Sequence, residues 1–117
     1  MADTLQLLTQ QLRDFAAARE WEQFHSPKNL ASALIVEAGE LLEHFQWATE
    51  EQSRNLSAEK RELVAGEMAD VLLYLVQLAS ALEVDLGEAA VKKIRMNGER
   101  YPVDLARGTS RKHDELW

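Results

Sequence analysis

The chain has 117 residues, of which 46% are hydrophobic and 28% charged, and this balance is typical of one soluble globular domain. Asp and Glu number 20 against 13 Lys and Arg, so the formal net charge is −7. Nucleic acids and anionic membranes favour basic surfaces, and the acidic balance therefore argues against both as partners. The absence of cysteine excludes disulfides, thiolate catalysis and cysteine-based zinc sites.

No targeting or membrane-spanning segment is expected. The N-terminal stretch MADTLQLLTQQ lacks the basic region and apolar core of a signal peptide. The most apolar run, Val71 to Leu82, is too short to span a bilayer and is interrupted by Gln77. We therefore expect a soluble, cytoplasmic protein that contacts no membrane.

Helical periodicity predicts two helices in the first half of the chain. The first covers residues 3–20, with an apolar stripe formed by Leu5, Leu8, Leu12 and Phe15. The stretch WEQFHSPKN then breaks the pattern. The second helix covers residues 27–48, because Ser26 is a good N-cap and Pro27 is favoured at the first helical position.

Two further helices are predicted in the second half. Residues 49–56 are polar and are expected to form a loop, after which Ser57 caps a long helix over residues 57–82. A fourth helix, over residues 86–100, begins at Asp85 and ends before Pro102, which disfavours a helical residue in front of it. The tail, residues 103–117, is expected to be irregular.

The helix predicted for residues 57–82 is apolar on nearly every side. Its apolar residues are Leu63, Val64, Met68, Val71, Leu72, Leu73, Leu75, Val76, Leu78 and Leu82. A helix that is apolar all round must be buried all round, and a chain of this length cannot easily surround one of its own helices. We therefore predict an all-α protein with a single domain over residues 1–117, a four-helix-type bundle that is completed by homo-oligomerisation.

Acidic residues recur at a three-residue spacing on two of these helices. Glu37, Glu40 and Glu43 lie in EAGELLEHFQW, and Glu67 and Asp70 lie in EMAD within the most apolar helix. Residues i and i+3 share a helix face, with Cβ atoms about 5–6 Å apart, so two facing pairs would form if these helices pack antiparallel.

Carboxylates gathered in apolar surroundings repel one another and need a cation to neutralise them. Oxygen ligands favour Mg²⁺ or Mn²⁺, so the four residues of the two pairs are candidate metal ligands: Glu37, Glu40, Glu67 and Asp70. Such pairs also occur on solvated helix edges, and the pattern alone leaves both interpretations open. Glu43 is a further ligand or a surface acid. A di-iron site is disfavoured, because only Glu22 to His25 has the Glu-x-x-His spacing.

Basic and aromatic residues accompany the acidic pairs. Lys93, Asn97 and Arg100 lie at i, i+4 and i+7, a face that could meet phosphates beside a cation or could simply favour a helix C-terminus. The aromatic residues Trp21, Phe24, Trp47 and Tyr74 either stack on a base or belong to the core.

Together these motifs resemble the MazG-like all-α nucleoside triphosphate pyrophosphohydrolase superfamily. The signature of this superfamily is Glu-x-x-Glu on one helix and Glu-x-x-Asp on the next, and Glu37-Ala-Gly-Glu40 and Glu67-Met-Ala-Asp70 resemble it. The stretches REWEQFHSPKNLA, EAGELLEHFQW, EMADVLLYLVQLA, VDLGEAAVKKIRMN and RYP resemble the dCTP pyrophosphatase branch in the same order, over roughly residues 12 to 115.

The resemblance implies Mg²⁺-dependent cleavage of a nucleoside triphosphate to its monophosphate and pyrophosphate. By position, the acidic quartet would bind Mg²⁺, and Lys93, Asn97 and Arg100 would meet phosphates. The residues implied around base and sugar are Trp21, Phe24, His25, Trp47 and Tyr74. The family also implies a helical bundle completed across subunits, as a dimer or a tetramer.

We predict that Mg²⁺ activates a water and that Glu40, central in its row, accepts the proton as the catalytic base. Some dCTP-preferring relatives carry a histidine that faces the base in the first helix, whereas this helix has none. Modified dCTP and a broader set of dNTPs are therefore alternative substrates. The alternatives are dUTP, a phosphoribosyl intermediate of histidine synthesis, or a non-enzymatic helical oligomerisation module.

Overall fold

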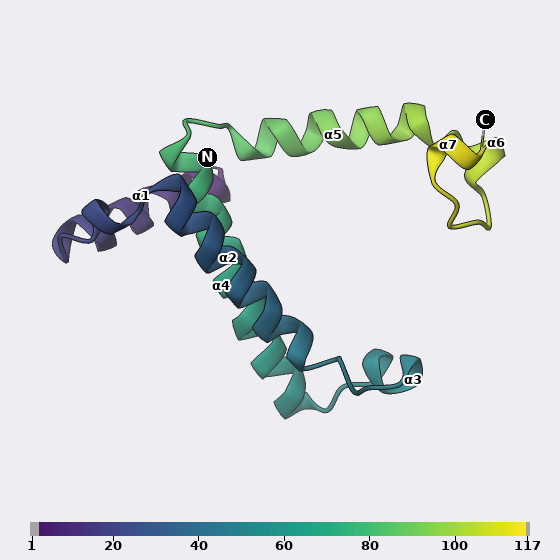
Figure 1. Ribbon diagram of the computed structural model, residues 1–117, viewed down its shortest axis with the longest axis horizontal. Coiled ribbons are helices and arrows are strands. Elements are labelled where there is room, and N and C mark those ends of the chain that lie inside the picture. Colours follow the sequence, from purple (N-terminus) through teal and green to yellow (C-terminus); the bar gives the residue numbers. More distant parts are fainter. Residues whose placement is uncertain (1–2, 117) are drawn as a thin grey trace. The chain divides into compact units, whose positions relative to one another are not determined.

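The computed structural model describes residues 3–116, and every regular element within this range is helical (Figure 1). The prediction of an all-α protein is therefore confirmed. In chain order the elements are α1 (Thr4–Ala18), the 3-10 helix η1 (Glu22–Phe24), α2 (Pro27–Glu43), α3 (Glu50–Arg54), α4 (Ala58–Ala81), α5 (Leu86–Arg100), α6 (Val103–Ala106) and α7 (His113–Leu116).

The chain divides into two compact units, Met1–Val84 and Asp85–Trp117. The first unit contains the helices α1 to α4, and the second contains α5 to α7. The single domain over residues 1–117 stays a prediction.

Side-chain caps start the helices where the sequence predicted them. Ser26 Oγ accepts a hydrogen bond from Asn29 N–H, and Pro27 occupies the first turn of α2. Ser57 Oγ accepts from Lys60 N–H at the start of α4, and an Asp85 carboxylate oxygen caps α5 in the same way. Each cap satisfies a backbone N–H that has no partner within the helix.

Three segments differ from the prediction. Helix α2 ends at Glu43 rather than at residue 48, because the next N–H groups fold back onto Leu41 and Leu42 in tighter turns. The expected loop over residues 49–56 contains α3, which a Thr49/Gln52 capping box starts. The tail contains α6 and α7 and is not wholly irregular.

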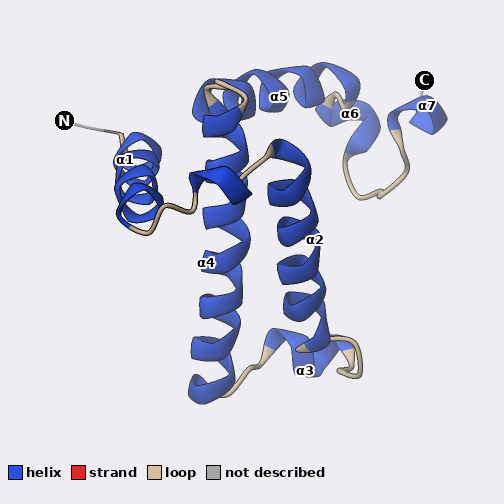
Figure 2. Cartoon of the chain, turned by 60° about the vertical axis from the view of Figure 1, so that its left-hand side comes forward, coloured by secondary structure: helices blue, strands red, loops and turns tan. Residues whose placement is uncertain are grey.

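The first unit is organised around α2 and α4, which lie side by side and antiparallel (Figure 2). Leu30 of α2 and the α4 residues Val64, Val76 and Ala79 are buried. Helix α1 also packs on α4: Ala16 is buried there, and Arg13 Nε donates a hydrogen bond of 3.0 Å to Ser80 Oγ.

Much of α4 is left uncovered, as its all-round apolar character led us to expect. Leu63, Met68 and Leu72 are exposed. Among the described residues α4 is the one helix long and apolar enough to cross a membrane, a test that core helices of soluble proteins also pass. Glu67 and Asp70 near its middle favour a helix built around a polar site.

Candidate functional site

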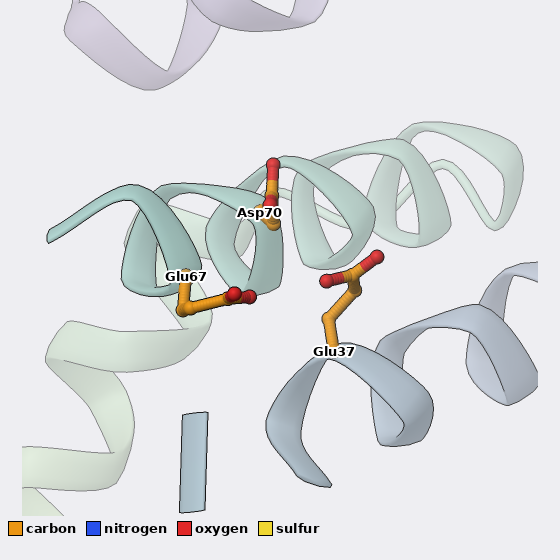
Figure 3. A group of neighbouring side chains, drawn as sticks. All are labelled: Glu37, Glu67 and Asp70. Carbon is orange, nitrogen blue, oxygen red and sulfur yellow. The ribbon is translucent and has the colours of Figure 1, made fainter. Parts of the chain in front are cut away.

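Three carboxylates from the two antiparallel helices meet in the first unit. Glu37 of α2, Glu67 and Asp70 of α4 each offer an oxygen, and these oxygens all lie within 4.8 Å of one another. Figure 3 shows the Glu37 side chain reaching from α2 toward α4 and the Glu67 side chain reaching back. The predicted convergence of the two acidic pairs is thus present for three of the four residues.

The cluster follows directly from helix geometry. Glu67 and Asp70 share a face of α4 because they lie three residues apart, and the antiparallel packing of α2 places Glu37 opposite them. Glu40 is not one of the three clustered residues but lies beside Glu37, whose carboxyl shares a hydrogen bond with it. Glu43 is exposed at the last position of α2.

The electrostatics of the cluster are unfavourable in the absence of a cation. The pKa of Glu37 is raised to about 6, first by the hydrogen bond with Glu40, then by desolvation and by the negative charges of Glu40, Asp70 and Glu67. The Oε2 atoms of Glu37 and Glu67 are buried and have no hydrogen-bond partner among the described residues. A buried carboxylate oxygen without a hydrogen-bond donor is unfavourable, and binding of a cation would compensate for the missing donor.

His44 is a neighbour of the cluster that the motif analysis did not include. Its Nε2 lies 3.8 Å from Glu67 Oε1, and both side chains are partly buried. The sequence did indicate this position. His44 lies seven residues, or about two helical turns, after Glu37, so the two residues lie on the same face at the end of α2.

A cavity of about 510 Å³ adjoins the cluster, with Asp70 in its wall. It is lined by Leu8, Gln11, Leu12, Phe15, Trp21, His25, Asp70, Leu73, Tyr74 and Gln77. Three of the residues predicted around the base are therefore brought together here: Trp21, His25 and Tyr74. Its volume is in the range of small-molecule sites.

The wall of this cavity contains an ordered aromatic pair. Phe15 and Trp21 pack edge to face, with ring centroids 5.7 Å apart. The Arg19 guanidinium lies 3.5 Å from the centre of the Phe15 ring. These contacts hold the segment between α1 and η1 against the end of α1.

Two predicted aromatic residues do not line this cavity. Phe24 is 58% exposed, and Trp47 is 89% exposed in the segment that follows α2. The exposure of Trp47 follows from the early end of α2, because the residue lies beyond the helix and not on the face that carries the acidic row. Its predicted contact with a base stays a prediction.

The predicted phosphate-binding residues lie in the second unit. Lys93, Asn97 and Arg100 are exposed on α5, at the i, i+4 and i+7 positions of one helix face. Their shared face is as predicted. Their role toward phosphate stays a prediction.

We expect the stability of the metal-free protein to depend on the ionisation of Glu37. Its pKa is raised in the folded chain, so its contribution is fully present below pH 4.5 and is lost as the pH rises through 6. Glu37→Gln cannot ionise, so its melting temperature should exceed that of the wild type by an amount that grows across this interval. Thermal denaturation in a chelator at a series of pH values measures this difference.

Glu43→Gln is the matched control, since it removes an exposed glutamate from the same helix. An equal gain in both variants would show that net charge, rather than the cluster, causes the effect. A constant difference between Glu37→Gln and the wild type at all pH values would contradict the raised pKa.

Comparison with known proteins places the chain in a family. Residues 33–116, which include the whole acidic cluster, match the MazG-like family. The chain is 49% identical over 105 residues to dCTP pyrophosphatase 1 of Homo sapiens, and 47% identical to that of Mus musculus. These alignments cover 88% of this chain and 62% of each relative, so the chain spans less than two thirds of their length.

A solved structure is also similar. A pyrophosphatase from Archaeoglobus fulgidus DSM 4304 is 35% identical, with a TM-score of 0.81 over 87% of this chain and 95% of that chain. Fold and site together define an all-α protein with an acidic cluster held between two antiparallel helices. The protein belongs to the MazG-like family, and the resemblance drawn from the motifs is confirmed.

Proposed function

We propose that the protein hydrolyses a nucleoside triphosphate, best dCTP or a modified dCTP, to the monophosphate and pyrophosphate with the help of a divalent cation. The single observation that carries this proposal is the position of Asp70. It belongs both to the acidic cluster and to the wall of the 510 Å³ cavity. A cation-binding group next to a cavity with aromatic walls suits a ligand that has phosphates at one end and a flat base at the other.

The clustered residues fit a divalent cation. Glu37, Glu67 and Asp70 supply oxygens from two helices, and two of their buried oxygens have no donor among the described residues. An all-oxygen set favours Mg²⁺, for which Mn²⁺ can substitute. When bound, the cation would neutralise triphosphate oxygens and lower the pKa of a water.

We assign the proton transfer to Glu40. It lies outside the group of three and is hydrogen-bonded to Glu37, so its carboxylate is not committed to the cation in this assignment and would accept a proton from an attacking water. The cavity residues Trp21, His25 and Tyr74 would surround the base, with Phe24 and Trp47 as further contacts. As predicted from the sequence, Lys93 and Arg100 of α5 would neutralise phosphate oxygens, and Asn97 would donate a hydrogen bond to them.

The similarity to dCTP pyrophosphatase 1 supports dCTP as the substrate, and the similarity to a pyrophosphatase supports the reaction. Pyrophosphate release should be measured with dCTP, modified dCTP, dUTP and the other dNTPs. We expect the highest kcat/KM with a cytosine nucleotide in Mg²⁺. EDTA should abolish release, and added Mg²⁺ should restore it. Turnover that persists in EDTA would contradict the role of the cluster.

We further propose that the protein is a cytoplasmic homo-oligomer, a dimer or a dimer of dimers. The exposed apolar residues of α2 and α4 support self-association, because an apolar face of this kind is normally covered. A non-enzymatic oligomerisation module is the alternative. It predicts no thermal stabilisation by Mg²⁺ with dCTP, whereas binding of both by the folded enzyme should raise the melting temperature.

A further inference from the structure

Gln77 is the polar interruption of the apolar run in α4, and the proposed function assigns no role to it. It lines the 510 Å³ cavity and also a second cavity of about 320 Å³ between α1, η1 and α4. Leu12 and His25 line both cavities as well. Gln77 therefore contributes a neutral amide to the walls of both cavities.

The orientation of this amide is determined by one hydrogen bond. Gln77 Nε2 donates to the Leu73 carbonyl oxygen at 3.2 Å. A carbonyl oxygen can only accept, so the NH₂ half of the amide must face Leu73, and rotation of the amide by 180° would lose the bond. The Oε1 atom is thereby left as an acceptor, and no described residue donates to it.

The surroundings make this acceptor selective. Leu8, Leu12, Phe15 and Leu73 form apolar walls of the same cavity. In such a cavity a few placed polar groups determine which ligand fits and in which orientation. A ligand group with an N–H opposite Oε1 gains a hydrogen bond, whereas a carbonyl there faces a second acceptor and loses its bonds to water.

We propose that Gln77 is a specificity-determining residue that selects bases with an exocyclic amino group. Its Oε1 accepts a hydrogen bond from the 4-amino group of cytosine and disfavours uracil and thymine, which carry a carbonyl at that position. The inference rests on the proposed function, because the proposed function places the base in this cavity. It also accounts for cytosine recognition by a chain whose first helix contains no histidine.

The test uses Gln77→Leu, which removes the acceptor, and Gln77→Glu, which keeps an acceptor and cannot donate. Gln10→Leu is the matched control, because Gln10 is exposed on α1, outside both cavities, and its side chain donates a hydrogen bond to Asp14. Two readouts are compared: kcat/KM with dCTP and dUTP in Mg²⁺, and calorimetric binding of the products dCMP and dUMP. Melting temperatures establish that each variant is folded.

In Gln77→Leu we expect the dCTP/dUTP ratio of kcat/KM to fall by about tenfold or more, the effect of one lost hydrogen bond, mainly through weaker use of dCTP. Preference for dCMP over dUMP should fall in parallel. Gln77→Glu keeps an acceptor but loses the bond to Leu73, so it should retain more of the cytosine preference than Gln77→Leu, and Gln10→Leu should match the wild type. An unchanged ratio in Gln77→Leu, or equal binding of dCMP and dUMP by the wild type, would overturn the inference.

Failure of the proposed function gives a different result. A wild-type protein that releases no pyrophosphate from any nucleotide, but binds dCMP better than dUMP and loses this preference in Gln77→Leu, would refute the hydrolase and retain Gln77 as the residue that selects the base. A wild-type protein that binds neither product overturns both.

Discussion

Replacement of Asp70 by Asn is expected to lower pyrophosphate release by about 100-fold or more, because it removes a charged ligand from the cation site. Asp70 is the member of the cluster that also lines the cavity, so in the proposed function both binding of the cation and placement of the triphosphate would depend on it. The same change should raise the melting temperature of the metal-free protein. It relieves repulsion between carboxylates that the fold holds within 4.8 Å of one another.

The combination of lost activity and gained stability is the diagnostic outcome. A residue needed only for folding would lose both together when replaced. Asp14→Asn, on the exposed side of α1, is the control and should change neither quantity by a comparable amount. Turnover and thermal denaturation in EDTA are measured on the same preparations. Undiminished turnover in Asp70→Asn would remove Asp70 from the site.

Introduction of a glutamate at Leu42 or Met68 is expected to dissociate the oligomer. The two side chains are 60% and 57% exposed, and they line a surface hollow of about 370 Å³ between α2 and α4. All six residues of the hollow are apolar: Ala38, Leu41, Leu42, Phe45, Val64 and Met68. A second copy of the chain would bury an introduced carboxylate without a partner, a cost of about 3–5 kcal/mol, which is more than 100-fold in association.

Analytical ultracentrifugation over a range of concentrations measures this change. The wild type should sediment as a dimer or a larger species, and both variants should shift toward the monomer. Leu7→Glu, an equally apolar and exposed position on α1 outside the hollow, is the matched control. A monomeric wild type, or full assembly of Leu42→Glu and Met68→Glu, would show that another element covers this face.

Local patterns were sufficient to predict most of the helices. The starts at Ser26, Ser57 and Asp85 were predictable, because a cap depends on one side chain and an N–H three residues later. The same reasoning missed α3, although Thr49 and Gln52 form a capping box. That segment is polar and therefore gives no apolar helical pattern. Its short helix is instead stabilised by hydrogen bonds of the capping box, and none of its residues is buried.

The acidic cluster was predictable as two pairs, and its composition was not. Spacing places Glu37 with Glu40 and Glu67 with Asp70, since residues three apart share a helix face. Which of the four meet depends on the rotation of α2 against α4, and this rotation brings Glu37 to the α4 pair while Glu40 stays beside it. The proximity of His44 to Glu67 has the same origin.

By itself, the sequence determined the helical class, the main helix starts and the residues able to form a cation site, because each follows from chemistry within a few positions of the chain. Tertiary structure alone decided where α2 ends, which carboxylates converge, and which side chains enclose the cavity. The hydrogen bond from Gln77 Nε2 to the Leu73 carbonyl oxygen and the place of Gln77 in the cavity wall also required the structure. These features depend on how helices that are distant in the sequence pack against each other, and local sequence patterns do not determine that packing.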